Sequence, residues 1–430
     1  MRRLWMDLIS DHDYHLKLLI MKFILYTFLV ICFALCTGCE SRKSYVVTNH
    51  PQASILLSDF DSLFSLNLKE ITLSNDFILS EVESIETICL ETSDKSLIGR
   101  ISMVEITDSL IIVADDIAPK KVLAFNIDGT FSHQIGAIGE GPEDYSSINQ
   151  VFIANGSVYI LDWTRSKLLT YKLTGEFISA IEIARPERPE NIYLTDGGYI
   201  GTYAAYFERN PFNIRTFGMD GVVTGTALPF KYTRPNPAGH IVKDARLGQL
   251  FYTSLCDTIY SVSDSVINAI GRFGLYGPND VPNFIEATSA LNNRDYYRFM
   301  NTSSDIKIVN YIEMTVMPDS WYIEYQTPQY SYSCIVDPLT LRSKRYLRTD
   351  ISNKFCYFPF VIVGKNGAAS LLSYMDETAS NALSEENLNY LRECFLTKGC
   401  NLSFGESTFE NNNPIIIKFN LKTSMAETDI

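Results

Sequence analysis

The chain has 430 residues, of which 46% are hydrophobic and 20% are charged, a composition typical of a folded protein. Its 50 acidic residues outnumber the 36 basic ones, which gives a formal net charge of −14 at pH 7. A surface of this sign repels nucleic-acid phosphates and anionic lipid headgroups, so we expect no nucleic-acid partner.

The first recognisable element is a nearly continuous apolar run over residues 18–37, long enough to span a bilayer. It ends in Thr37-Gly38-Cys39 and is followed at once by polar residues. A charged start, an apolar core and a small-residue end are typical of a signal peptide, which we place at residues 1–38. An uncleaved signal-anchor helix is the alternative. Met21-Lys22 and the apolar run already form a compact signal peptide. We therefore interpret Met21 as the true first residue, and residues 1–20 as the result of a start codon assigned too early.

The cysteine at the end of this segment resembles that of a bacterial lipobox, although Cys36 stands where a lipobox usually has Leu. The resemblance implies that a diacylglyceryl group is attached to Cys39 and that cleavage leaves this residue at the N-terminus. We therefore expect a lipid-anchored protein of the cell envelope, at the outer membrane and facing the periplasm or the cell surface. Ser41-Arg42-Lys43 lacks the acidic run associated with surface export, which favours the periplasm.

Behind the anchor, residues 39–80 are polar and without a sustained period, and we predict a tether there. From Glu81 onward, short runs rich in Val, Ile, Tyr and Phe alternate with Gly, Asp and Asn turns. This alternation predicts successive antiparallel strands, because β-branched and aromatic side chains pack well on a pleated surface.

The strands belong to an internal repeat. Residues 122–136, 168–182 and 213–227 share a pattern whose turns fall at Asp128-Gly129, Thr174-Gly175 and Asp220-Gly221, 46 residues apart. Further copies occupy residues 258–274, with a turn at Asp264-Ser265, and residues 333–347 and 415–424. Asp-Gly and Thr-Gly between apolar runs indicate β-hairpins. A period near 46 residues is typical of a propeller blade, so we predict an all-β, six-bladed β-propeller over residues 81–430.

Residues left over by the repeat are assigned to two amphipathic helical insertions, at 284–300 and 377–395, where apolar residues recur every three or four positions. The later copies of the repeat are degenerate, so four, five or seven blades remain alternatives to six.

A family resemblance follows from the stretch 131–175, which contains a G-x-G-P loop at Gly139–Pro142, a V-Y-I-x-D strand and a Gly turn. This order is similar to an NHL-type propeller repeat, and residues 111–129 match its second half. With the lipobox, the chain resembles the six-bladed β-propeller lipoproteins of Bacteroidetes. It departs from NHL repeats in having Glu143-Asp144 where Gly is common and in lacking an Asn-His-Leu tripeptide. The resemblance implies a fold and a cellular location but no reaction.

No catalytic group, metal site or cofactor is predicted. The glycine loop 136–142 lacks the Lys and Ser/Thr of a phosphate-binding loop. Asp115 and Asp162 each end a strand and are interpreted as caps of the following turns, with calcium binding at Asp115-Asp116 as the weaker alternative. Of the five histidines, only His50, His133 and His240 follow Cys39, and they have no metal-ligand spacing.

We predict ligand binding at side chains near strand ends, where stacking on a ring suits a carbohydrate and the alternative is packing between blades. These residues are Trp163, Arg165, Tyr203, Tyr206, Phe207 and Trp321. Cys394 and Cys400 are the best candidates for a local disulfide, and Cys89, Cys334 and Cys356 are expected to be small buried side chains.

The sequence thus predicts a membrane-anchored binding or scaffold module for a carbohydrate, peptide or protein. The alternative is a lyase or hydrolase acting on carbohydrate or peptide.

Overall fold

The structure is a computed structural model whose described residues lie in one compact unit, Pro51–Ile430. They are residues 64–74, 77–116, 120–183, 188–204, 211–230, 238–263, 266–302, 309, 311–327, 330–350, 355–356, 370–375, 385–400 and 412–422. The signal peptide and Cys39 lie outside these ranges. Among the described residues, no helix is both long and apolar enough to cross a membrane.

Strands follow one another as antiparallel sheets, because each apolar run turns back on the one before it. Sheet 1 contains β4 (Ile101–Ile106), β5 (Leu110–Asp115), β6 (Lys121–Asn126) and β7 (Phe131–Gln134). Sheet 2 contains β8 (Gln150–Ala154), β9 (Ser157–Asp162), β10 (Lys167–Lys172) and β11 (Phe177–Glu182). Sheet 3 contains β12 (Asn191–Leu194), β13 (Gly198–Thr202), β14 (Phe212–Gly218) and β15 (Val223–Pro229).

The second half of the chain adds strands from the N-terminal region to this pattern. Sheet 4 contains β16 (His240–Asp244), β17 (Gly248–Thr253), β18 (Cys256–Val262) and β19 (Ile267–Arg272), with β1 (Phe64–Ser65) parallel to β19. Sheet 5 contains β20 (Tyr311–Val316), β21 (Trp321–Gln326), β22 (Tyr330–Val336) and β23 (Ser343–Asp350), with β2 (Leu73–Ser74) and β24 (Phe355–Cys356) paired to β23. Sheet 6 contains β25 (Ser370–Met375), β26 (Ile415–Leu421) and β3 (Val82–Cys89).

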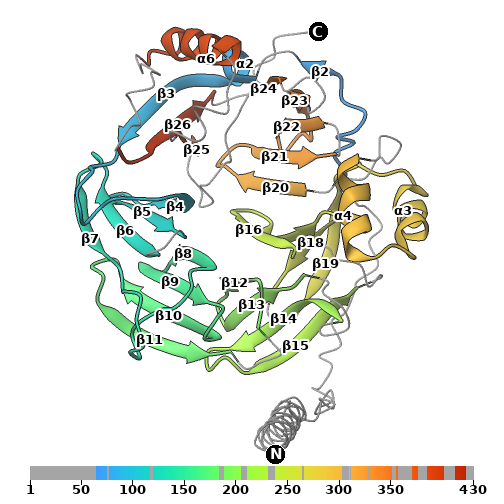
Figure 1. Cartoon of the computed structure of the whole chain (residues 1–430). Helices are drawn as coiled ribbons and strands as arrows, with labels where there is room; N and C mark the ends of the chain where they lie inside the picture. The colour runs from blue at the N-terminus through green and yellow to red at the C-terminus, as the bar shows by residue number, and fades with distance from the viewer. Residues whose placement is uncertain are drawn as a thin grey trace, which may run out of the picture. The chain divides into compact units, whose positions relative to one another are not determined.

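These sheets form a β-propeller. In Figure 1 they follow one another around a common centre, with the first strand of sheets 1–5 innermost. Each pair of neighbouring sheets encloses a hydrophobic cluster, and sheet 6 packs against sheet 5 through Ile417 and against sheet 1 through Ile416. Because adjacent side chains on a strand point to opposite faces, these two residues contact different neighbours. The core is therefore distributed between the sheets.

In sheets 1–5 the predicted repeat coincides with the third and fourth strands, and in sheet 6 the last copy coincides with β26. Copies 122–136, 168–182 and 213–227 form the hairpins β6–β7, β10–β11 and β14–β15. Their turn glycines have positive φ angles of 89°, 85° and 78° for Gly129, Gly175 and Gly221. Each glycine is the last residue of a three-residue hairpin loop, in which Asn126, Lys172 and Gly218 accept from the glycine N–H, and this position requires a left-handed backbone. The turn expected at residues 264–265 lies outside the described residues.

These glycines also allow neighbouring sheets to approach closely. A Cβ at Gly129 would lie 2.2 Å from the carbonyl oxygen of Cys89, the last residue of β3. At Gly175 and Gly221 the corresponding distances are 3.0 Å to Gln134 O and 2.4 Å to Glu182 O. In each case the carbonyl belongs to the last residue of the outer strand of the preceding sheet. A side chain is therefore excluded by the contact as well as by the turn.

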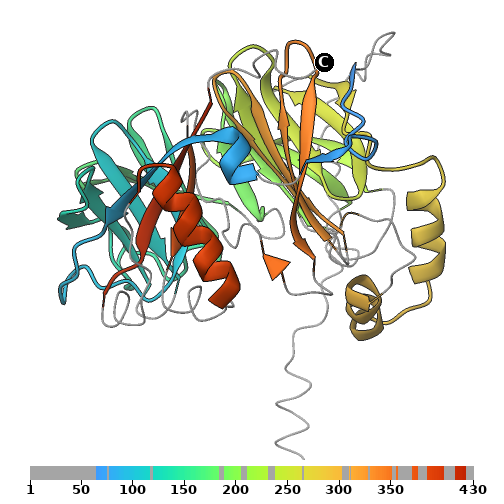
Figure 2. The same cartoon turned by 90° about the horizontal axis from the view of Figure 1, so that it is seen from above.

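The helices confirm both predicted insertions and change their limits. The first insertion is two helices, α3 (Asp280–Thr288) and α4 (Asn293–Thr302), because Asn292 starts a second helix by accepting a hydrogen bond from Asp295 N at 3.0 Å. The second insertion contains α6 (Glu385–Thr397), and residues 376–384 are not described. Figure 2 shows α6 and the short helix α2 (Phe77–Glu81) along the outside of the propeller.

The tether predicted over residues 39–80 is wrong for the described part of that range, which contains β1, β2 and most of α2. Residues 64–74 run along the outer strands of sheets 4 and 5, where Leu66 N donates to Arg272 O and Leu73 is opposite Arg345. Only two residues pair in each of β1 and β2, which is too few to produce a periodic sequence pattern. The N-terminal strand β3 then completes sheet 6 by pairing antiparallel with the C-terminal strand β26.

We expect Gly129→Ala to destabilise the protein far more than Gly156→Ala. Both glycines have positive φ, but no atom lies within 4 Å of the position of a Cβ at Gly156. The φ strain alone should cost about 1–2 kcal/mol, whereas Gly129→Ala must also displace the Cys89 carbonyl, for a total of roughly 3 kcal/mol or more. Urea unfolding of both variants provides the measurement, and equal losses would contradict the close approach of the sheets.

Candidate ligand-binding site

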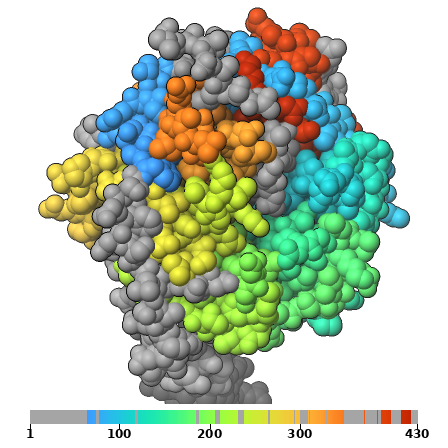
Figure 3. Space-filling view, turned by 180° about the vertical axis from the view of Figure 1, so that it is seen from behind, coloured from blue at the N-terminus to red at the C-terminus, as the bar shows by residue number. Residues whose placement is uncertain are grey.

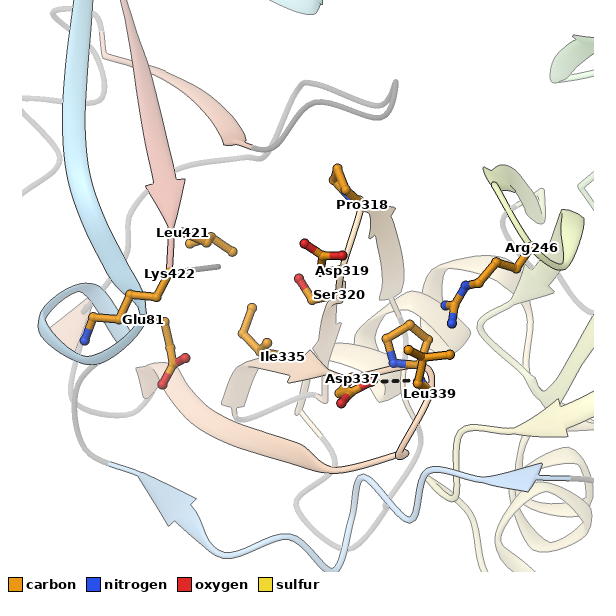
Figure 4. A pocket seen from close by; sticks show the side chains of 11 residues that line it. Glu81, Arg246, Pro318, Asp319, Ser320, Ile335, Asp337, Leu339, Leu421 and Lys422 are labelled. Atoms are coloured by element: carbon orange, nitrogen blue, oxygen red, sulfur yellow. Dashed lines mark hydrogen bonds between the residues drawn. The ribbon is translucent and has the colours of Figure 1, made fainter. Parts of the chain in front are cut away.

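Three turns from two neighbouring sheets enclose a pocket with a volume of about 380 Å³. The turns are those between β16 and β17 of sheet 4, and between β20 and β21 and between β22 and β23 of sheet 5. The last residue of α2 and the end of β26 complete the wall. Figure 4 shows the lining residues, which are Glu81, Arg246, Pro318, Asp319, Ser320, Ile335, Asp337, Pro338, Leu339, Leu421 and Lys422.

Glu81 is the most enclosed charged group of this pocket, with 7% of its surface exposed. Its Oε1 atom accepts hydrogen bonds from the ammonium of Lys344, at 3.0 Å, and from the hydroxyl of Tyr346. Both partners come from β23, so Glu81 connects the end of α2 to sheet 5. A buried carboxylate paired in this way is held in a fixed position.

Asp337 is positioned by its own turn. Its Oδ1 accepts hydrogen bonds from the backbone N–H groups of Leu339 and Thr340, at 2.8 and 3.2 Å, and its Oδ2 from the Thr340 hydroxyl at 2.6 Å. The Thr340 hydroxyl is the largest cause of a lowered pKa at Asp337, and the charge of Arg246 adds to it. Arg246 in turn lies 3.8 Å from the carboxylate of Asp244. This arginine is therefore already paired with a carboxylate of its own turn.

The remaining charged groups are Lys422 and Asp319. The Lys422 ammonium donates to the carbonyl oxygen of Ser80 and points away from the centre of the pocket in Figure 4. Asp319 lies on the turn between β20 and β21, and within the described part of the chain no hydrogen bond or ion pair engages its carboxylate. Its exposed carboxylate is available to a ligand.

Aliphatic surface fills the spaces between these charges. Ile335 and Leu421 line one side, and Leu339 is 78% exposed at the mouth. The pocket is flanked by Pro318 and Pro338, and none of its lining residues is aromatic. The arrangement can hold a ligand that combines charge with aliphatic groups, and it offers no ring for a sugar to stack on.

Two of the predicted binding residues are buried in the propeller instead. Trp321 is fully buried between sheets 4 and 5, and its Nε1 donates to Asp244 Oδ2 at 2.8 Å. Burial alone would raise the pKa of Asp244, but this bond and those from the following turn outweigh it and lower the pKa. Tyr203 is 3% exposed in the cluster between sheets 2 and 3. Both rings pack between sheets because their strands direct them away from solvent.

Trp163 and Arg165 lie together on the turn after β9, at the opposite ends of the strands from the pocket. The guanidinium of Arg188 covers the Trp163 ring, 3.8 Å from its centroid, and donates to the Trp163 carbonyl at 2.7 Å. Arg165 donates to the carbonyl oxygens of Gly139, Gly141 and Asp144 at 2.5–3.1 Å. Arg165 thus organises the glycine loop. Tyr206 and Phe207 lie outside the described residues.

Within the described residues, Asp115 and Asp162 accept hydrogen bonds from the segment that leads into the first strand of their own sheet, and Asp162 also caps the following turn as predicted. Asp115 accepts from Gly99 N and Arg100 N, at 2.7 and 3.1 Å. Asp162 accepts from Ser146 N at 2.7 Å and from the Ser147 hydroxyl at 2.6 Å, and its one bond to the following turn is from Arg165 N. In a propeller the second strand ends beside the segment entering the first, which sequence order alone does not reveal.

The cysteines also differ from expectation. Cys394 and Cys400 are free thiols buried in the cluster between sheets 5 and 6. Cys400 follows Gly399, which ends α6 with φ of 81°, and Cys400 N donates to Phe395 O at 2.8 Å, which fixes the cap without a disulfide. Cys334 is buried as predicted, but Cys89 is exposed at the end of β3, and the side chain of Cys356 is not described.

One group of residues was not found from the sequence. Glu313 and Glu324 are directly opposite each other on β20 and β21, with exposures of 7% and 4%. Glu324 accepts a hydrogen bond from Tyr322 at 2.6 Å, and Glu313 lies 3.6 Å from His240 Nε2. Only the strand register brings these carboxylates together. Across the described ranges, no cluster of three metal-binding side chains is found.

Comparison with protein families gives one match, to the family "Domain of unknown function (DUF4934)", over residues 64–420. A search of curated proteins returns no match. Among solved structures, an exported protein from Bacteroides fragilis is similar, with a TM-score of 0.62 and 16% identity over 84% of this chain and 100% of that one. This likeness supports the propeller fold.

Two further solved structures have lower TM-scores with this chain. A member of the DUF4221 family from Bacteroides vulgatus has a TM-score of 0.47 and 10% identity, over 79% of this chain and 98% of that one. A streptogramin B lyase has a TM-score of 0.39 and 10% identity, over 79% of this chain and 97% of that one.

We expect Asp162→Asn to make the free energy of unfolding less dependent on pH in the acid range. Burial alone would raise the pKa of Asp162, but hydrogen bonds from Ser147, Ser146 and Arg165 outweigh it and lower the pKa. The folded pKa thus lies below the unfolded one, so the stabilisation is present above about pH 4 and is lost as the pH falls through the folded pKa.

Urea unfolding at pH 7 should show a loss of about 1–3 kcal/mol in Asp162→Asn, because the variant cannot accept charged hydrogen bonds. At pH 3 the difference from the unmodified protein should become smaller. The exposed Asp108 provides the control, since Asp108→Asn should change neither value. A difference that stays constant between the two pH values would contradict the assignment.

Proposed function

We propose that this chain, which belongs to the family of the domain of unknown function DUF4934, is an extracytoplasmic β-propeller that binds a ligand in the pocket described above. The observation that carries this proposal is the pocket itself, because three turns of sheets 4 and 5 and the end of β26 place charged and aliphatic side chains around one cavity. Its volume is within the range of small-molecule and peptide sites, about 300–1,000 Å³.

In this proposal the propeller has six blades. Sheets 1–5 have at least four strands each, and the three described strands of sheet 6 form the remaining blade. The hydrophobic clusters support this arrangement, because sheet 6 packs against both sheet 5 and sheet 1. The pairing of β3 with β26 then closes the ring by joining the two ends of the domain.

The proposed location is the cell envelope, with the propeller attached to a membrane through a lipid on Cys39. Support comes from the sequence, where the apolar run 18–37 ends in Thr37-Gly38-Cys39. The Bacteroides fragilis protein, whose structure is similar, is described as exported. In this arrangement the propeller would act as a binding or interaction scaffold facing the periplasm or the cell surface.

A second candidate function, a hydrolase or lyase, is favoured by one observation. Glu313 and Glu324 are opposite each other on β20 and β21, and acid–base hydrolysis uses two carboxylates. The pair is almost completely buried, which is why we place ligand binding first. The test is incubation with a panel of oligosaccharides and peptides. New reducing ends or new amino termini that appear with the unmodified protein and not with Glu324→Gln would establish the enzymatic function.

We expect that closing the pocket abolishes ligand binding. Leu339→Trp adds a large ring at the mouth, and Leu396→Trp adds the same ring to α6 at another exposed leucine, of 61% exposure. A panel of short peptides and oligosaccharides is screened by thermal unfolding, because a ligand at 100 times its Kd stabilises the folded state by roughly 2.7 kcal/mol.

At least one probe should raise the Tm of the unmodified protein and of Leu396→Trp, but not that of Leu339→Trp. A probe that raises all three Tm values binds elsewhere and would exclude the pocket as its site.

We expect Cys39→Ala to release the protein from the membrane. The variant lacks the sulfur to which the lipid would be attached, so a labelled fatty acid should no longer be incorporated. Fractionation and mass spectrometry of the mature N-terminus provide the measurement, with Cys36→Ala as the control. A mature chain that begins elsewhere, or a Cys39→Ala variant that stays in the membrane, would disprove the anchor.

A further inference from the structure

We propose that the pocket receives a short peptide segment carrying a basic side chain, and that Asp319 binds the positive charge. This proposal rests on the proposed function, since it names the class of ligand for the same pocket. It is based on three features: which charges in the pocket are already paired, what kind of surface surrounds them, and the charge of the whole chain.

The first feature is the pairing of charges. The carboxylate of Glu81 is engaged by Lys344, and that of Asp337 by its own turn, with Arg246 contributing to its lowered pKa. Neither of these carboxylates therefore needs a cation from a ligand.

The cations of the pocket are also engaged. Arg246 lies 3.8 Å from the carboxylate of Asp244, and the Lys422 ammonium is bound to the Ser80 carbonyl outside the pocket centre. Asp319 remains as a carboxylate that the described residues leave without an ionic partner. Figure 4 shows Asp319 beside Ser320 on the wall opposite Leu421, so a group bound to it would lie across the cavity. The unpaired charge of the site is negative, which favours a cation.

The second feature is the surface around this carboxylate. Ile335, Leu339 and Leu421 provide aliphatic contacts of the kind that the methylene groups of Lys or Arg can use. A carbohydrate would instead be expected to find an aromatic ring, and none lines the pocket. Ser320 adds a hydroxyl that can bond to a peptide backbone.

The third feature is long-range. The chain has a formal net charge of −14, so its overall field attracts positively charged ligands and repels negatively charged ones. Attraction of this kind weakens as salt is added, because ions screen charges separated by more than about 8–10 Å at moderate ionic strength. Binding of the proposed ligand should therefore depend on salt concentration.

The test measures binding of three peptides to the full chain by calorimetry in mild detergent. The probes are acetyl-Leu-Lys-Leu-Gly-amide and its analogues with Gln or Glu in place of Lys. The lysine peptide should bind about three- to fivefold more tightly than the Gln peptide, the range expected for one exposed ion pair. This preference should disappear in Asp319→Asn and in high salt, and it should persist in Asp108→Asn, which removes an exposed carboxylate elsewhere.

The outcomes separate this inference from the proposed function. Equal binding of the Gln or Glu peptide, or an unchanged lysine preference in Asp319→Asn, would overturn the basic-peptide assignment. The pocket would remain the ligand site if Leu339→Trp blocks binding of the Gln or Glu peptide. It would also remain the ligand site if no peptide binds and Leu339→Trp blocks binding of an oligosaccharide. Binding of the lysine peptide that survives Leu339→Trp would reject the pocket itself, and with it both proposals.

Discussion

The approach of each hairpin turn to the preceding sheet is the constraint on which the rest of the structure depends. Gly129, Gly175 and Gly221 each lie against the carbonyl oxygen that ends the previous outer strand. A side chain at these positions would separate the sheets, and the hydrophobic clusters between them would lose contact. The regular spacing of the repeat is therefore a packing requirement between sheets, in addition to a requirement of the turn within each sheet.

Local sequence patterns predicted the repeated hairpins well, because a tight glycine turn and alternating apolar residues are both determined within about fifteen positions. They failed where a partner comes from a distant part of the chain. Trp321 was expected to bind a ligand but bonds to Asp244 inside the protein. The segment 64–74 was expected to be a free tether but pairs with β19 and β23, since backbone pairing needs no side-chain pattern. Such contacts follow from the ring, which a single repeat does not specify.

The candidate pocket illustrates the same limit. Glu81, Asp319 and Lys422 reach one cavity from three parts of the chain, and no short motif connects them. Aromatic residues near strand ends were predicted to bind a ligand because a ring suits a carbohydrate, but the propeller uses Trp321 and Tyr203 for packing between its sheets. The pocket depends on turns, whose composition is less constrained by packing than that of the strands and can differ between proteins of one fold.

The pairing of β3 with β26 also determines when the molecule can be complete. Residues 82–89 have no partner strand on this side until residues 415–421 have been synthesised, so the first outer strand of the sequence waits for the last. Leu421 and Lys422, at the end of β26, line the pocket. A chain that stops short of its final strand would thus have an open ring and an incomplete pocket at once. Ligand binding would in this way distinguish finished molecules from truncated ones.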